Sequence, residues 1–273
     1  MRTFKNTIIP KEYRGSAIAI GNFDGVHRGH QKVFRQAKKY AKKNKIKFGV
    51  LTFTPLPVMF FNRNIKNCRL VSENKKFQLF EKYGVDFVIN IKFNKIFSKI
   101  TAVKFIKNII FKKINPRLIF VSNNFKFGNK RKGNVRLLKK FSKKYDYRLV
   151  NTMAFKHKGK VVSSTQIRKS LQNGHLDLAN TLLSRTWFIE GVVQKGKKLG
   201  KKLGYPTCNI KIKSYVLPKI GIYTVKILIE NNKKIMNGIA YLGYRPTFAG
   251  NKIMLEVNIL QLCIQMISVY RID

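Results

Sequence analysis

The sequence is poor in acidic residues and in cysteine. Only 11 of the 273 residues are Asp or Glu, against 57 Lys or Arg, which gives a formal net charge of +46. The three cysteines, Cys68, Cys208 and Cys263, are odd in number and have no CxxC spacing, so they indicate neither a disulfide framework nor a zinc site. No stretch approaches the ~18 uninterrupted apolar residues of a membrane span, and the N-terminus lacks the apolar core of a signal peptide. We therefore expect a soluble, cytoplasmic protein with reduced thiols and no membrane partner.

The excess of positive charge raises the question of nucleic-acid binding, because clustered cations release counterions from phosphate backbones. The 43 Lys and 14 Arg are spread along the whole chain among many Asn residues, whereas a dedicated patch is more local and richer in Arg. A compositional bias or a solvated face explains such a spread. We expect weak, salt-sensitive and nonspecific binding to anionic polymers, and no specific recognition on charge alone.

Hydrophobic residues make up 44% of the chain, which at this length is enough for two compact domains. From residue 16 to about residue 151, apolar runs alternate with helical patterns, which is typical of βαβ units on a parallel sheet. Residues 1–185 are therefore predicted to form a doubly wound, Rossmann-like α/β domain that binds ligands beyond the carboxyl ends of its strands. The predicted strands are 16–21, 47–53, 86–91, 117–121 and 147–151, and the predicted helices are 29–43, 72–82, 101–113 and 134–144.

The residue pattern of the sequence changes near residue 185. A capped helix that ends at Asn173-Gly174 and a second helix at 175–184 come first, and short β-rich runs follow, separated by Gly, Pro and Asn. This pattern predicts a smaller antiparallel β-barrel over residues 186–273. The predicted barrel strands are 186–193, 222–229, 235–242 and 253–260.

The stretch GNFDGVHRGH, residues 21–30, joins the first predicted strand to the first predicted helix. Backbone N–H groups at such a turn bind anions, and Gly29 lets the main chain approach them closely. His27 and His30 are spaced so that both can face one phosphate group, where donors stabilise the charge that grows during adenylyl transfer. Two histidines in a turn can also be plain surface residues, but the strand-to-helix context favours a nucleotide site.

The same stretch resembles the first motif of the bacterial bifunctional riboflavin kinase/FMN adenylyltransferases, also called FAD synthetases, within the HxGH nucleotidylyltransferase superfamily. Similar strings follow in the family's order: TFTPLP (52–57), NFKFGNKRKG (124–133), SSTQIR (163–168), GKKLGYPTCNI (200–210), PKIGIYTV (218–225), NGIAYLGYRPTF (237–248) and LEVNIL (255–260). The resemblance implies an enzyme of FAD biosynthesis with Mg²⁺ as cofactor and ATP, riboflavin and FMN as substrates. The FMN phosphate would attack the α-phosphorus of ATP and release pyrophosphate, and the barrel would phosphorylate riboflavin.

The resemblance also implies roles for residues of the first domain. His27, His30 and Arg168 would be catalytic, with ATP bound by Gly21, Asn22, Phe23, Asp24, Gly29, Ser163, Ser164 and Thr165. Taken alone, the SSTQIR string is a helix cap followed by a surface arginine. The flavin side of the substrate would contact Asn124, Phe125, Phe127 and Arg131, although the two phenylalanines have the spacing of strand core residues.

For the kinase step, the resemblance implies that Glu256 is the catalytic base for the ribityl hydroxyl. Gly196, Gly200 and Gly204 would admit the phosphates of ATP, and Thr207 and Asn209 would hold the metal with hard oxygen ligands. A glycine-rich barrel turn and a salt-bridged strand glutamate are the plain alternatives.

Four departures from the family pattern stand out. Leu56 replaces a histidine of the TFxPHP string, Ser122 replaces a glycine, and residues 258–262 differ from the family's usual run after Glu256. The family's last strand and C-terminal helix have no counterpart, so a barrel wall and part of the riboflavin site are expected to be lost and an edge left open. Three alternatives stay open: a monofunctional FAD synthetase with a degenerate kinase domain, a non-enzymatic cationic RNA-binding relic, and an adenylyltransferase for another substrate.

Overall fold

A computed structural model describes residues 1–62, 65, 67–194, 207–212, 214–230, 234–245, 252–260 and 266–271. Its packing divides the chain into two compact units, Met1–Ile65 with Glu73–Ser163, and Lys66–Ser72 with Ser164–Asp273. The division by packing places residues 164–185 with the barrel. The boundary near residue 185 that the sequence predicts for the functional domains stays a prediction.

Six parallel strands form the sheet of the first unit, in the order β1-β4-β3-β2-β5-β8. The strands are β1 (Arg2–Phe4), β2 (Ala17–Ile20), β3 (Phe48–Thr54), β4 (Phe87–Lys92), β5 (Leu118–Ser122) and β8 (Arg148–Thr152). Five of them lie where the sequence predicts strands, and only the three-residue β1 was missed. Since β3 and β4 lie to one side of β2 and β5 and β8 to the other, the strand order reverses at β2. Ligands of open α/β sheets bind at the carboxyl ends of strands at such a point.

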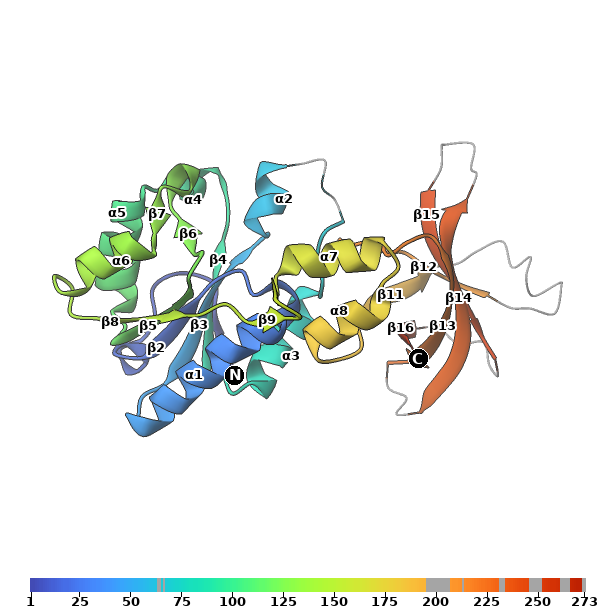
Figure 1. Cartoon of the computed structure of the whole chain (residues 1–273), viewed down its shortest axis with the longest axis horizontal. Helices are drawn as coiled ribbons and strands as arrows, with labels where there is room; N and C mark the ends of the chain where they lie inside the picture. Colours follow the sequence, from blue (N-terminus) through green and yellow to red (C-terminus); the bar gives the residue numbers. More distant parts are fainter. Residues whose placement is uncertain are drawn as a thin grey trace. The chain divides into compact units, whose positions relative to one another are not determined.

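Helices cover both faces of this sheet, so the predicted doubly wound arrangement is confirmed (Figure 1). On one face, Phe34 of α1 (Arg28–Lys43) packs against Phe48 and against Phe80 of α3 (Glu73–Lys82), with ring centroids 5.9 and 5.4 Å apart. On the other face, the apolar core includes residues of α6 (Val135–Ser142) and of the π-helix η3 (Phe105–Ile114). The predicted helix at 101–113 is thus α5 (Ala102–Lys104) followed by η3.

Short elements complete the first unit. They are η1 (Lys11–Tyr13), η2 (Asp24–Val26), α2 (Pro57–Phe61), α4 (Lys95–Ser98), β6 (Lys126–Phe127), η4 (Asn129–Arg131), β7 (Gly133–Asn134), β9 (Lys156–His157) and β10 (Lys160–Val161). In the part of the chain that the structure describes, no helix has the length and apolar character needed to cross a membrane.

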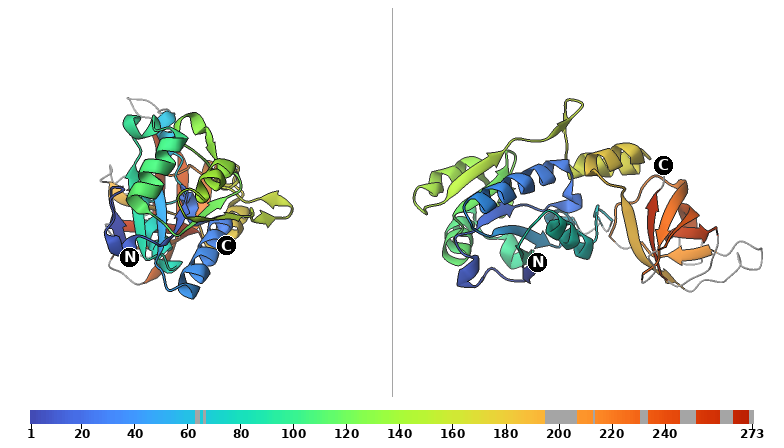
Figure 2. Two further views of the ribbon diagram at one scale, coloured as in Figure 1. Left: turned by 90° about the vertical axis from the view of Figure 1, so that its left-hand side faces the viewer. Right: turned by 90° about the horizontal axis from the view of Figure 1, so that it is seen from below.

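A closed antiparallel barrel forms the main part of the second unit, with the strand order β11-β12-β15-β14-β13-β16. The chain enters it through α7 (Ser164–Gln172) and α8 (Leu176–Leu183), drawn in yellow in the right-hand view of Figure 2. The strands are β11 (Phe188–Gln194), β12 (Thr207–Ile210), β13 (Gly221–Leu228), β14 (Ile235–Arg245), β15 (Lys252–Ile259) and β16 (Met266–Arg271).

The barrel prediction is confirmed, but the expectation of an open edge is wrong. Val269 of β16 pairs with Ile189 of β11 and with Ile227 of β13, so one strand satisfies the backbone groups of both edges. The barrel wall is therefore continuous.

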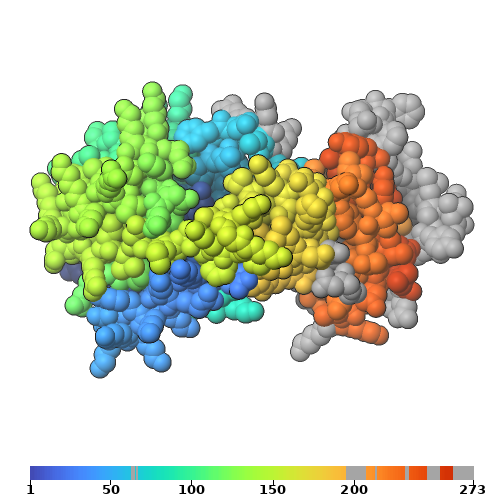
Figure 3. Space-filling model, viewed as in Figure 1, coloured from blue at the N-terminus to red at the C-terminus, as the bar shows by residue number. Residues whose placement is uncertain are grey.

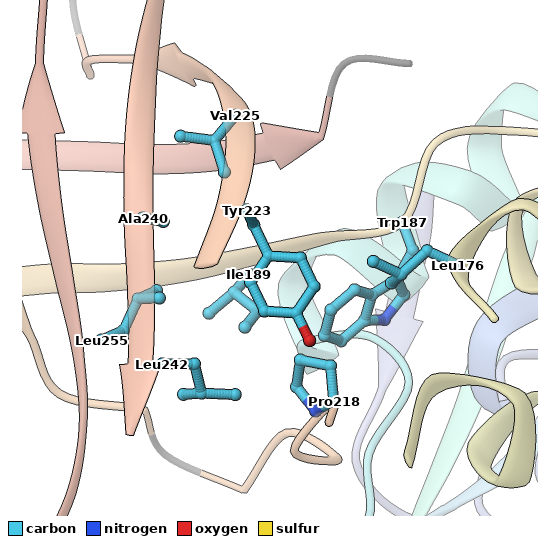
Figure 4. A pocket seen from close by; sticks show the side chains of 9 residues that line it. All are labelled: Leu176, Trp187, Ile189, Pro218, Tyr223, Val225, Ala240, Leu242 and Leu255. Atoms are coloured by element: carbon cyan, nitrogen blue, oxygen red, sulfur yellow. The ribbon is translucent and has the colours of Figure 1, made fainter. Parts of the chain in front are cut away.

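The barrel interior is apolar, as the alternation of its strands requires. Val225, Ala240, Leu242 and Leu255 point inward and are nearly fully buried. With Leu176, Trp187, Ile189, Pro218 and Tyr223 they line a cavity of about 50 Å³ (Figure 4). This space is partly open to solvent, and its lining is almost entirely apolar.

A segment from early in the chain, Cys68–Ser72, also packs in the second unit. Arg69 forms a parallel bridge with Tyr215, and the indole of Trp187 donates to the carbonyl of Leu70 at 2.9 Å. Ser72 and Tyr215 both donate to Oε2 of Glu190, at 2.5 and 3.2 Å. Burial and the nearby Glu190 charge raise the pKa of Tyr215 to about 12.

Lysines of the helices lie mostly on their solvent-facing sides. Lys38, Lys39, Lys42 and Lys43 of α1 are all exposed, and the helix presents this side at the surface in Figure 3. Buried positions of the same helix are taken by Val33, Phe34, Ala37 and Ala41. This alternation is what a solvated, lysine-rich face predicts.

Candidate functional site

The loop after β2 carries the first motif and has a strained backbone. Three of its residues have positive φ angles: Phe23 at 50°, Gly25 at 79° and Val26 at 42°. A left-handed conformation costs a non-glycine residue roughly 1–3 kcal/mol, and it is a clear outlier for a β-branched residue such as Val26. Such strain persists only where the surroundings enforce it, and it is common at functional sites.

Two buried side chains hold the carbonyl groups on either side of this strained stretch. Thr52 of β3 donates to the carbonyl of Asn22 at 3.1 Å, and Gln31 of α1 donates to the carbonyl of Val26 at 2.9 Å. Neither residue was predicted to belong to the site. Their signal in the sequence is weak, because a Thr in a strand and a Gln in a helix have many ordinary roles.

The two histidines of the motif lie together at the start of α1. Their rings stack with centroids 3.6 Å apart and an interplanar angle of 21°. His27 is 5% exposed and has extended φ and ψ angles as the residue before the helix, and His30 is partly buried with its ring edge-on to Phe23. The predicted pairing of the two imidazoles at the helix N-terminus is present, at the point where the strand order reverses.

Gly29 occupies a position where a larger residue would collide with this histidine pair. A Cβ atom at residue 29 would lie 3.1 Å from Cε1 and Nδ1 of His27 and 3.5 Å from the carbonyl oxygen of Val162. Val162 precedes Ser163, so the chain enters the SSTQIR string directly beside the first motif. The neighbouring Arg28 contacts the chain shortly before Val162, since its guanidinium lies 4.7 Å from the ring centroid of Phe155.

The predicted flavin-side residues lie after β5, which neighbours β2 in the sheet. Parallel strands end at the same edge of a sheet, so this loop and the histidine loop leave from neighbouring strand ends. Asn124 and Arg131 are exposed, and the side chain of Ser122 donates to Oδ1 of Asn124 at 2.8 Å.

The two phenylalanines of this loop take part in the core. Phe127 is 7% exposed and belongs to the apolar core, where Phe125 stacks on it with ring centroids 5.4 Å apart. Leu56, which replaces the histidine of the family string, is also buried, at 5% exposure. The alternative that Phe127 is a core residue agrees with this placement.

The SSTQIR string begins α7, as its sequence predicts. Ser163 ends the first unit and Ser164 begins the helix in the second, with Ile167 fully buried. Arg168 lies on the partly exposed side, and its Nε donates to the carbonyl oxygen of Cys68 at 2.6 Å. The segment Cys68–Ser72 therefore fixes the guanidinium of the predicted catalytic arginine.

The predicted kinase residues lie side by side on the barrel wall. Asn209 of β12 is the direct cross-strand partner of Glu256 of β15, and Thr207 lies two residues from Asn209 on the same face of β12. Directly opposed residues have Cβ atoms roughly 4.5–5.5 Å apart. Cys208 and Val257, which alternate with these residues, are buried on the inner face, so the three polar side chains are on the outer face.

The oxygen atoms of this cluster fit a magnesium ion. Asn209 is 9% exposed, and its Oδ1 has no hydrogen-bond partner among the residues that the structure describes. A buried amide oxygen is costly unless something binds it, and amide, hydroxyl and carboxylate oxygens are the ligands that Mg²⁺ prefers. Gly196, Gly200 and Gly204, which the sequence assigns to ATP, lie outside the described residues.

Two family models match different parts of the chain. A family model for FAD synthetase matches residues 9–166, and a model for riboflavin kinase matches residues 183–271. Two proteins named bifunctional riboflavin kinase/FMN adenylyltransferase are similar over most of the chain. The one from Buchnera aphidicola subsp. Schizaphis graminum is 40% identical over 247 residues, which cover 89% of this chain and 79% of that protein. The one from Escherichia coli strain K12 is 33% identical over 252 residues, covering 92% and 80%.

A solved structure has the same fold along nearly the whole chain. It is described as a macrolide-efflux protein from Streptococcus pneumoniae, and it matches with a TM-score of 0.87 and 26% sequence identity. The match covers 99% of this chain and 89% of that one. Both units therefore have a counterpart in a single experimentally determined chain.

Proposed function

The chain belongs to the family of bifunctional riboflavin kinase/FMN adenylyltransferases, and we propose that it makes FAD from riboflavin in two ATP-dependent steps. The barrel phosphorylates riboflavin to FMN, and the parallel-sheet unit transfers an adenylyl group from ATP to FMN. The stacked pair of His27 and His30 at the start of α1 is the observation that carries the second step.

In the adenylyl transfer, a phosphate oxygen of FMN attacks the α-phosphorus of ATP. The bond from this phosphorus to the oxygen that bridges it to the β-phosphorus breaks, and pyrophosphate leaves. His27 and His30 donate hydrogen bonds to phosphate oxygens whose charge grows as phosphorus becomes five-coordinate. Arg168, held by the carbonyl of Cys68, pairs with the triphosphate, with Ser164 and Thr165 as further donors. Catalysis then comes from positioning and charge stabilisation, with no covalent intermediate.

In the kinase step, Glu256 takes the proton of the ribityl 5′-hydroxyl as this oxygen attacks the γ-phosphorus of ATP, and ADP leaves. Thr207 and Asn209 would hold a Mg²⁺ ion, which would neutralise charge on the phosphates. The continuous barrel wall and the cross-strand pairing of Asn209 with Glu256 support a working kinase over the alternative of a degenerate domain.

The substrates are small molecules, and we propose two further properties of the protein. The chain has three cysteines, an odd number without CxxC spacing, which suits a reducing compartment, so we place the enzyme in the cytoplasm. The net charge of +46 predicts nonspecific, salt-sensitive binding to anionic polymers.

A crossed pair of variants tests both steps. Purified protein with Mg-ATP is given riboflavin in one assay and FMN in another, and the products are separated by chromatography. We expect His30→Asn to lower FAD formation from FMN by at least about a hundredfold and to leave riboflavin phosphorylation intact, and Glu256→Gln to do the reverse.

Each outcome of this design identifies one step. If wild-type protein converts FMN but not riboflavin, the kinase assignment falls and the enzyme is a monofunctional FAD synthetase. If neither substrate reacts, and RNA displaces bound ATP, the enzymatic proposal is replaced by a cationic RNA-binding protein.

A further inference from the structure

Lys76 is the one buried lysine among the residues whose exposure the structure describes. It is 5% exposed and lies in the first turns of α3, whereas the many other lysines of that part of the chain are partly or fully exposed. Burial of an ammonium group is costly unless nearby polar groups compensate it. The burial of Lys76, in contrast to the exposure of the other lysines that the structure describes, points to a specific task.

The ammonium group of Lys76 is connected to the histidine loop by two successive contacts. Its Nζ donates to Oγ1 of Thr52 at 3.4 Å, and the same hydroxyl donates to the carbonyl of Asn22 at 3.1 Å. Thr52 is fully buried in β3. Because the hydroxyl accepts from a cation, it is a better donor to the carbonyl group, as hydrogen-bond chains polarise one another.

The Asn22 carbonyl is the last group before the strained stretch that leads to His27. Residues 23–26 include the three positive φ angles, and α3 contacts η2, which forms within this stretch. On the far side of the stretch, Gln31 holds the carbonyl of Val26. The hydrogen bonds from Lys76 through Thr52 thus hold one end of the loop, and the hydrogen bond from Gln31 holds the other.

A second set of hydrogen bonds anchors α3, the helix that carries Lys76. Glu73, one turn earlier on α3, accepts from the hydroxyl of Thr54 at 2.7 Å and from the amide of Asn90 at 3.2 Å. Residues 73 and 76 share a face of the helix, so α3 is attached to the ends of β3 and β4 by one residue and to the loop after β2 by the other.

We propose that Lys76, acting through Thr52, is a positioning residue for adenylyl transfer: it holds the backbone that presents His27 and His30 to the phosphates. Its catalytic consequence rests on the proposed function, but the positioning of the histidine rings is measurable without any activity. The sequence conceals this role, because Lys76 is one of two adjacent lysines in a chain full of them.

The test uses the full-length chain, three single variants and one double variant. Thr52→Val removes the hydroxyl and keeps the shape of the side chain, Thr52→Ser keeps the hydroxyl, and Lys76→Met removes the charge. We expect Thr52→Val and Lys76→Met to lower kcat for FAD formation from FMN by about tenfold, with KM for FMN and the rate of riboflavin phosphorylation within about threefold of wild type. Thr52→Ser should retain kcat within about threefold, and Lys76→Met added to Thr52→Val should cost less than about twofold more.

Histidine ring resonances in a two-dimensional NMR spectrum give a readout that does not depend on catalysis. Thr52→Val and Lys76→Met should shift the signals of His27 and His30 and leave those of His157 and His175 unchanged. If wild type makes no FAD but these shifts occur, the proposed function fails and the positioning role stands.

The positioning role is overturned if both disruptive variants leave the signals of His27 and His30 in place. It is also overturned if Thr52→Ser is as damaging as Thr52→Val, or if all four histidine signals change together with a loss of folded protein.

Discussion

Replacing Gly29 by alanine tests whether the position of the histidine pair limits the rate of adenylyl transfer. The added Cβ would lie 3.1 Å from two ring atoms of His27, and ordinary contacts of this kind begin at 3.4 Å. The ring must therefore move by at least 0.3 Å, the difference between these two distances. His27 is 5% exposed and stacked on His30, so its displacement passes to its partner.

The expected loss follows from that displacement. A misplacement of 1 Å costs roughly a hundredfold in rate, so on a logarithmic scale shifts of about 0.3–0.5 Å lower kcat about fourfold to tenfold. Stability should change little, because alanine in place of glycine favours a helix by up to about 1 kcal/mol and the collision opposes that gain. The variant should therefore lose rate while its free energy of unfolding stays within about 1 kcal/mol of wild type.

The assay measures kcat for FAD formation from FMN, riboflavin phosphorylation in the same sample, and unfolding by denaturant. Gly221→Ala is the matched control, because a Cβ at residue 221 would meet no atom within 4 Å. Full adenylyl-transfer activity in Gly29→Ala would refute the reasoning. A loss of rate that only follows a loss of folded protein would refute it as well.

Three further predictions concern the second unit. Asn209→Leu should abolish riboflavin phosphorylation in the product assay, while denaturant unfolding shows unchanged stability or a gain of about 1 kcal/mol, because a buried acceptor without a described partner is removed. Tyr215 has a pKa of about 12 in the fold against about 10 when unfolded, so it contributes stability that is fully present below pH 10 and is lost as the pH rises through 12. Wild type should lose about 2–3 kcal/mol more than Tyr215→Phe over that range in pH-dependent unfolding, and equal slopes would contradict this. Ala240→Val adds two methyl groups at the barrel cavity of about 50 Å³ and should raise the free energy of unfolding by about 0.5–1 kcal/mol, whereas a decrease would show that the space does not admit them.

Strong periodic patterns made most of the fold predictable from the sequence. Strands β2, β3, β4, β5 and β8 lie within a residue or two of their predicted ranges. The first four are mostly buried apolar runs, whereas only Thr152 of β8 is buried. The three-residue strand β1 and the hairpin of β9 and β10 were missed, since their mostly exposed residues leave no apolar pattern. The two-residue strands β6 and β7 and the barrel strands β12 and β16 were missed as well. The interior of η3 is wound as a π-helix, which the same apolar pattern cannot distinguish from an α-helix.

Barrel closure could not be predicted because it depends on pairing between distant strands. β16 is a short segment near the chain end, and its two partners begin at residues 188 and 221. The missing family segments suggested an open edge, but hydrogen bonding of β16 to both neighbours closes it. Local pattern predicts that a segment is a strand, and only the whole barrel determines where it pairs.

Some features of the candidate site follow from the local sequence, whereas others depend on contacts between residues far apart in the chain. The stacked histidines follow from a motif of ten consecutive residues, and the sequence predicted their shared position at a helix start. The contact of Arg168 with the Cys68 carbonyl joins residues 100 positions apart, and nothing in the local sequence of either residue indicates it.

The lysine bias gives a general way to separate composition from function in this chain. A drift toward lysine places new lysines where they cost little, which is on solvent-facing positions such as those of α1. A buried position resists such drift, because an ammonium group there must be compensated. Because Lys76 is buried, the lysine-rich composition alone does not explain it, whereas the exposed lysines need no other explanation. Glu256 is set apart by composition as well, since it is one of only 11 acidic residues in the chain and lies on a barrel strand directly opposite Asn209.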